Sequence, residues 1–122
     1  MERNTVLSLS PNRDALRARE TTLRDGGWKV VSVMTPTQAR FEIEMGRCGI
    51  LLICYRLSTS DANDLCHLFR KNCPKGRIVF VTEPVSHWKE IPVETNVAIP
   101  ESSGPELLLG ALKENTSLER VR

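Results

Sequence analysis

Two apolar runs constrain the fold of this chain more than any other feature. Residues 49–55 read GILLICY, and residues 77–82 read RIVFVT. A strand with one solvent-facing side alternates apolar and polar residues, whereas these runs are apolar at successive positions. They therefore predict strands that are buried on both faces, in a parallel sheet with helices packed on each side.

Three other segments are predicted to complete the sheet. Residues 4–10 (NTVLSLS) and 30–34 (VVSVM) are rich in β-formers, and residues 96–99 (NVAI) give a shorter fifth strand. Strands that alternate with helices predict an α/β fold, here a doubly wound, five-stranded parallel sheet in a three-layer α/β/α domain. We expect the domain to span residues 1–114 and residues 115–122 to form a polar tail.

Each segment between the predicted strands opens with residues that favour a helix N-terminus. Thr35 offers an N-cap, Pro36 suits the first turn and Gln38 can complete a capping box. Residues 41–45 (FEIEM) alternate apolar and acidic side chains and would also suit a strand, but the start at Thr35 favours a helix. Similar start signals predict helices over residues 15–24, 62–71 and 107–113.

Charge and hydropathy exclude two classes of partner. The net charge is +2, so the chain lacks the dense basic surface of a nucleic-acid-binding protein. The longest uncharged apolar run, residues 48–55, is far shorter than the roughly 20 residues that span a bilayer. The first residues lack the apolar core of a signal peptide. We therefore expect a cytoplasmic protein that binds neither nucleic acid nor membrane.

The four cysteines predict neither a disulfide framework nor a metal site. Cys48, Cys54, Cys66 and Cys73 include no Cys-x-x-Cys pair, and zinc ligands usually lie two to four residues apart. Two of the cysteines lie in apolar stretches, where a thiol packs as a small hydrophobe. We expect reduced, buried thiols, no metal and no cofactor.

The order and spacing of several short motifs resemble those of a known family. Residues 6–12 (VLSLSPN), 50–58 (ILLICYRLS) and 77–82 match the first, third and fourth strands of the receiver domain of bacterial response regulators. Ile99-Pro100 stands where that family has a Lys-Pro dipeptide, and residues 105–108 (PELL) resemble the start of its last helix. The resemblance covers residues 4–114 and implies a flavodoxin-like, CheY-like fold.

The resemblance also implies that the phosphorylation chemistry of the family is missing. Ser10 and Pro11 stand in place of the acidic pair, and Cys54 stands in place of the phosphorylated Asp. The position of the family's lysine falls on Ile99 or on Pro100, depending on a one-residue gap, and Thr82 alone matches the family pattern. A pocket without carboxylates offers Mg²⁺ no charge. The expectation is a degenerate receiver domain of two-component or phosphorelay signal transduction that is not an enzyme and acts by protein–protein interaction without phosphorylation.

The face that carries output in the family differs as well. The stretch between Thr82 and the fifth strand is shorter than in the family, and prolines at 84 and 92 leave room for two helical turns at most. We expect the fourth helix to be shortened or absent. Trp88 then either covers the vacated space or anchors an interface. The sequence leaves the isomer of the Ile99-Pro100 bond open.

Two helices offer candidate interfaces with a protein partner, for instance a kinase or another signalling protein. Arg13, Arg17 and Arg24 share one face of the first helix, which is either a solvated face or a docking surface for an acidic partner. In the last helix, Leu107, Leu108, Ala111 and Leu112 predict an inward stripe. Leu109 points elsewhere, on the helix through which receivers often pair, so a homodimer is a second expectation.

Cys54 also supports an alternative function. It lies at the carboxyl end of a central strand, where open α/β sheets bind ligands. With a cation such as Arg56 or a helix N-terminus nearby, its thiol would suit a thiol- or redox-sensing regulatory domain. The simpler interpretation is a small apolar residue that fills the space of the missing Asp. A third hypothesis is a flavodoxin relative that binds a small anion at residues 8–14.

Overall fold

The predicted parallel sheet is confirmed by the structure. The computed structural model describes residues 4–83 and 91–113. One five-stranded sheet has the order β2-β1-β3-β4-β5, and every neighbouring pair is parallel. The strands are β1 (Thr5–Leu9), β2 (Lys29–Val33), β3 (Ile50–Cys54), β4 (Arg77–Thr82) and β5 (Val97–Pro100).

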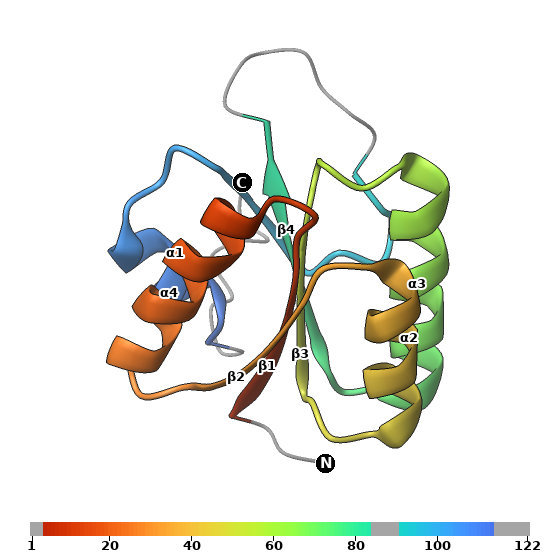
Figure 1. Ribbon diagram of the computed structural model, residues 1–122. Coiled ribbons are helices and arrows are strands. Elements are labelled where there is room, and N and C mark those ends of the chain that lie inside the picture. Colours follow the sequence, from red (N-terminus) through yellow and green to blue (C-terminus); the bar gives the residue numbers. More distant parts are fainter. Residues whose placement is uncertain (1–3, 84–90, 114–122) are drawn as a thin grey trace.

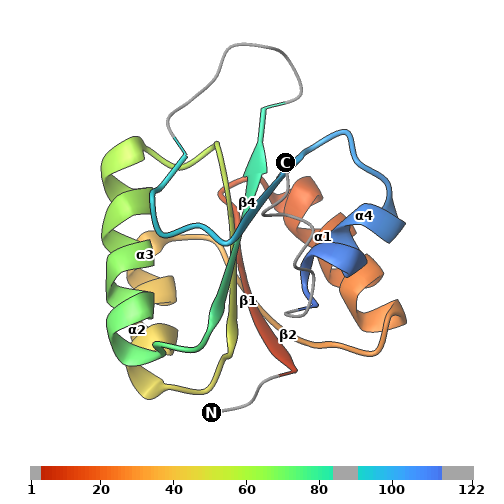
Figure 2. The same ribbon diagram turned by 180° about the vertical axis from the view of Figure 1, so that it is seen from behind.

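Helices cover both faces of this sheet. Helices α1 (Arg13–Asp25) and α4 (Pro105–Ala111) lie on one face, and α2 (Pro36–Met45) and α3 (Thr59–Asn72) lie on the other (Figure 1). The view from behind shows the same three layers (Figure 2). The chain passes from β1 to β2 on one side, and then from β2 through α2 to β3 on the other side of β1, so the direction of strand addition reverses at β1. Doubly wound sheets place their ligand crevice at the carboxyl edge of such a switch point.

Local capping explains where the helices begin and end. The side chain of Asn12 accepts a hydrogen bond from the Ala15 N–H at 2.8 Å, and that of Ser58 accepts one from the Asp61 N–H at 3.0 Å. Thr35 forms the capping box predicted for α2, so the alternative of a strand at residues 41–45 is wrong. Gly46 ends α2 with a φ of 72°, a conformation that suits glycine because it has no Cβ.

The core has one layer on each side of the sheet. Leu7 and Leu9 of β1 pack with Phe69 and Phe80 on the side of α2 and α3. Val6 packs with Leu23 of α1 on the opposite side, in a cluster that also contains Cys54 and Leu108. Every residue of β1, β3 and β4 is buried. This burial is what the uninterrupted apolar runs predict.

The prediction for α4 is wrong at two positions, Leu107 and Leu109. Leu107 is 51% exposed, whereas Leu108 and Ala111 are buried as expected. Leu109 is half-buried and packs against the α1 side of the core. Its side chain lies so close to the backbone just after α1 that a Cβ on the C-cap residue Gly26 would be 2.6 Å from Leu109 Cδ2. On α4, Leu107 and not Leu109 therefore faces outward.

Some predictions fall outside the described residues. These are the shortened fourth helix and Trp88, which lie in residues 84–90, and the polar tail, which lies in residues 114–122. Within the described ranges, no helix has both the length and the apolar composition needed to cross a membrane.

Candidate functional site at the carboxyl edge of the sheet

The structure brings the predicted pocket residues to one edge of the sheet. Ser10 follows β1, Cys54 ends β3 and Thr82 ends β4. Because parallel strands run in one direction, their carboxyl ends meet at the same edge. The Cys54 thiol lies 3.8 Å from the hydroxyl of Ser10 and donates to it, and neither residue is exposed to solvent.

Ser10 is engaged in fixing the start of α1. Its hydroxyl accepts a hydrogen bond from the Asn12 N–H at 3.2 Å and lies 3.3 Å from the Asn12 carbonyl, to which it can donate. Its backbone N–H donates to the Val33 carbonyl of β2. Pro11 is exposed. These contacts give Ser10 a structural role between β1 and α1.

Thr82 and Pro100 face each other across neighbouring strands. The two residues are in register between β4 and β5, and the Thr82 hydroxyl donates to the Ile99 carbonyl at 3.4 Å. The Ile99 side chain is buried in the core. The described residues contain no cis peptide bond, so the Ile99-Pro100 bond is trans. An apolar side chain thus stands where the resemblance places a lysine.

The sequence patterns do not predict a charged cluster that lies at this edge. Glu101 directly follows β5, and its carboxylate accepts hydrogen bonds from Arg19 Nη2 at 3.1 Å and from the Tyr55 hydroxyl at 2.8 Å. Arg56 binds the same carboxylate through both Nη atoms. The partners come from α1 and from the turn after β3, so Glu101 connects three segments that are distant in sequence.

The ionisation of these groups follows from their contacts. Burial raises the pKa of Tyr55, and the hydrogen bond to Glu101 adds to that effect. The hydrogen bond to Glu101 raises the pKa of Arg56. Burial alone would raise the pKa of Glu101, but the bonds from Arg56 and Tyr55 outweigh it and lower the pKa. The cluster therefore contains an ionised carboxylate between two guanidinium groups.

Arg56 was expected to be a candidate activator of the Cys54 thiol. Instead, its guanidinium binds Glu101 and lies 4.9 Å from the centre of the Tyr55 ring. Cys54 is packed in the apolar layer beneath α1 and α4. These contacts favour the simpler interpretation of Cys54 as a space-filling residue.

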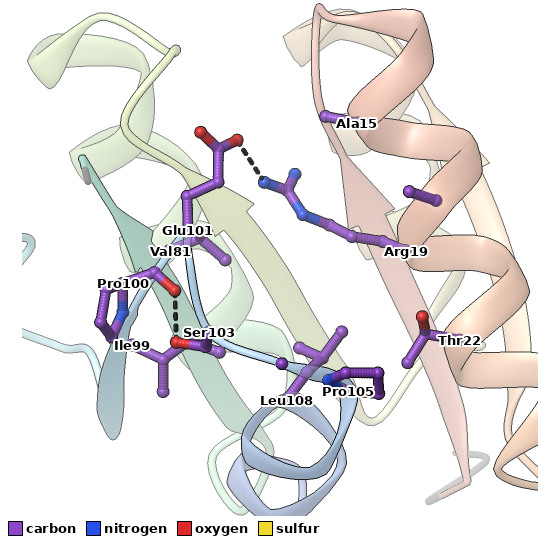
Figure 3. Close-up of a pocket in the computed structure, with 12 residues that line it drawn as sticks. Ala15, Arg19, Thr22, Val81, Ile99, Pro100, Glu101, Ser103, Pro105 and Leu108 are labelled. Atoms are coloured by element: carbon purple, nitrogen blue, oxygen red, sulfur yellow. Dashed lines mark hydrogen bonds and ion pairs between the residues drawn. The ribbon is translucent and has the colours of Figure 1, made fainter.

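A hollow of about 190 Å³ opens beside the cluster (Figure 3). Arg19 and Thr22 of α1 line one side, and Ser103 and Pro105 line the other. The Ser103 hydroxyl donates to the Pro100 carbonyl at 2.5 Å, which tightens the turn between β5 and α4. The Arg19 and Glu101 side chains meet across the hollow (Figure 3).

The arginine face of α1 is only partly available for an interface. Arg13 and Arg17 are exposed. Arg24 forms an ion pair with Glu20 at 3.0 Å and donates to the Val30 carbonyl at 3.3 Å. The available positive charge is therefore concentrated in the first half of α1.

Comparison with known proteins gives a match in structure alone. No protein-family model matches the sequence, and no curated protein matches it either. A CheY-like response regulator receiver domain from Methanospirillum hungatei superposes with a TM-score of 0.76 at 17% identity, covering 97% of each chain. A response regulator receiver protein from Sinorhizobium medicae gives 0.75 at 19% identity, covering 88% of this chain and 90% of that one. This chain has the fold of a receiver domain.

A further structure with the receiver fold comes from Burkholderia pseudomallei. That response regulator was solved with a phosphorylated aspartic acid, a calcium ion and citrate. It is 16% identical, with a TM-score of 0.78, and the match covers 97% of this chain and 71% of that one. In the described part of the present chain, no group of three or more His, Cys, Asp or Glu side chains is placed to hold a metal ion.

Proposed function

We propose that this chain is an atypical receiver domain of two-component or phosphorelay signalling and that it is not an enzyme. In this proposal it acts in the cytoplasm by binding another protein, without being phosphorylated. The observation that carries the proposal is the pair Ser10 and Cys54. In the resemblance, these side chains occupy the positions of an acidic residue and the phosphoacceptor. Both are fully buried, and the Cys54 thiol donates a hydrogen bond to the Ser10 hydroxyl. Neither can form an acyl phosphate.

The electrostatics of the pocket support the same conclusion. Transfer of a phosphoryl group to an Asp needs carboxylates to hold Mg²⁺ and a cation to neutralise the phosphoryl oxygens. The position of that cation in the resemblance falls on Ile99 or Pro100, and both side chains are apolar. The nearby carboxylate of Glu101 is already bound by two arginines. A divalent cation would have to compete with both guanidinium groups.

A redox function centred on Cys54 is less well supported. A reactive thiol needs access to its oxidant and a neighbouring cation that stabilises the thiolate. Cys54 has no exposed surface, and the cation next in sequence binds Glu101. We therefore do not favour the thiol-sensing alternative.

Incubation with acetyl phosphate and Mg²⁺ is expected to leave the mass of the protein unchanged. The reason is the absence of a carboxylate at position 54. Intact-mass spectrometry checks this result, with an ordinary receiver domain as the positive control in the same tube. A stable increase equal to one phosphoryl group would contradict the proposal, and its position after proteolysis would identify the acceptor.

The exposed arginines of α1 are proposed to meet an acidic surface on a signalling protein or kinase. The double substitution Arg13→Glu and Arg17→Glu is expected to reduce capture of that partner by about tenfold, because each reversed charge turns attraction into repulsion at the interface. Affinity capture from the native host, quantified against the unmodified chain, measures the effect.

Lys71→Glu combined with Lys75→Glu provides the control, because it reverses the same number of charges at two exposed positions. Lys75 is exposed in the turn before β4, at the opposite edge of the sheet from the start of α1. Equal capture by the α1 variant and the unmodified chain would exclude α1 as the docking surface. Pairing of two copies through α4 would then be the next hypothesis, with the exposed Leu107 as its test position.

A further inference from the structure

The Glu101 cluster has the composition of an anion-binding site. Two guanidinium groups and a phenol converge on one carboxylate, and each contact is a hydrogen bond or ion pair. Planar guanidinium groups present paired N–H donors that match an oxyanion better than any other side chain does. Arg19 is only 9% exposed, so its charge is held largely away from water.

The donors and the acceptor belong to different parts of the fold. Arg19 is fixed in the middle of α1, and Tyr55 and Arg56 follow directly after β3. The Tyr55 N–H donates to the Val81 carbonyl, which holds the backbone of this turn against β4. Glu101 is supplied separately, by the turn between β5 and α4. The positions of the donors Arg19, Tyr55 and Arg56 are therefore set by segments other than the turn that carries the Glu101 carboxylate.

The turn that carries Glu101 has space around it. The hollow between α1 and α4 adjoins Glu101, Ser103 and Gly104. A tetrahedral oxyanion is similar in size to the carboxylate group and can take the same donors. Removal of the Glu101 side chain would thus leave Arg19, which is nearly buried and lines the hollow, and Arg56 without the carboxylate that they share.

We propose that Arg19, Tyr55 and Arg56 form an oxyanion-binding site that the chain fills with its own Glu101 carboxylate. The ligand class is a phosphate, sulfate or carboxylate group, bound through guanidinium and phenol donors and without a metal ion. The site lies beside the position at which the resemblance places a phosphoryl group. It does not depend on the proposed protein interaction, because it rests on contacts within this chain alone.

Substitution Glu101→Ala is expected to create a measurable site for inorganic phosphate. The melting temperature of this variant should rise by about 5 °C when phosphate is about tenfold above its Kd, whereas the unmodified chain should not respond in this way. The titration uses sodium chloride at matched ionic strength as its reference, because phosphate also stabilises proteins non-specifically. Because Arg56 is one of the three donors, Glu101→Ala combined with Arg56→Gln is expected to lose the phosphate-dependent rise in melting temperature.

Two further variants make the test decisive. Glu106→Gln removes an exposed carboxylate from the first turn of α4 and is the control for the change in charge. Glu101→Gln keeps the side-chain volume and is expected to show a smaller phosphate response than Glu101→Ala. It provides the test if the alanine variant does not fold. The proposal is overturned if neither Glu101 variant responds more than Glu106→Gln. A response that persists without Arg56 also overturns it.

Discussion

Cys54→Asp is expected to lower the free energy of unfolding by about 3 kcal/mol or more and to leave the protein unable to accept phosphate. Cys54 has no exposed surface and packs in the apolar cluster between β3 and the helices α1 and α4. A carboxylate at this position would lose its hydration, with the Ser10 hydroxyl in reach as a hydrogen-bond partner. We therefore expect that an Asp at position 54 does not make the domain a phosphoacceptor.

The pH dependence of this variant has a defined sign. Burial would raise the pKa of the introduced Asp above its unfolded value of about 3.9. Its destabilisation should therefore be small below about pH 4 and grow as the pH rises towards 7. Urea denaturation in reducing buffer at both pH values measures this change, with Cys54→Ser as the control of similar size. Stability equal to that of the serine variant at pH 7, or uptake of a phosphoryl group, would contradict the expectation.

Phe69→Ala is expected to cost about 4 kcal/mol of stability. Phe69 is 1% exposed and joins α3 to the apolar layer that contains Phe80 and Leu51. Its removal loses the transfer free energy of the ring and leaves a cavity that the parallel sheet cannot readily close. The midpoint of urea unfolding should fall by about 2 M at an unchanged m-value.

The same substitution at an exposed position tests whether the loss of stability comes from the burial of the ring or from the change of residue type. Phe41→Ala on α2 removes an identical ring that is 56% exposed, and its effect should be within about 0.5 kcal/mol. If Phe69→Ala and Phe41→Ala cost the same, the assignment of Phe69 to the core is wrong. The comparison requires that both variants remain soluble, because the free energy of unfolding is obtained from reversible transitions.

Much of the fold could be predicted because its signals are local. The apolar runs at β3 and β4 indicate burial on both faces, and Thr35 with Gln38 forms the capping box that its spacing predicts. The orientation of α4 could not be predicted in the same way. It depends on the turn after β5 and on the approach of Leu109 to the backbone of Gly26, which lie far apart in sequence.

The candidate site was predicted only in part, for a similar reason. Ser10 and Cys54 each follow or end an apolar strand, so the parallel sheet alone brings them together. Glu101 also lies just after a strand, and Arg56 lies just after another, which was a usable signal for their contact. Arg19 gave no such signal, because it lies in the middle of a helix and its burial results from the packing of α1 beside Glu101.

The helix caps described above have a consequence for substitutions at the candidate site. Asn12, Thr35 and Ser58 start three of the helices by bonding to their own first turns. The capping side chains belong to residues other than Cys54, Thr82 and Pro100. A change of side chain at those three positions therefore leaves the capping bonds of these helices in place.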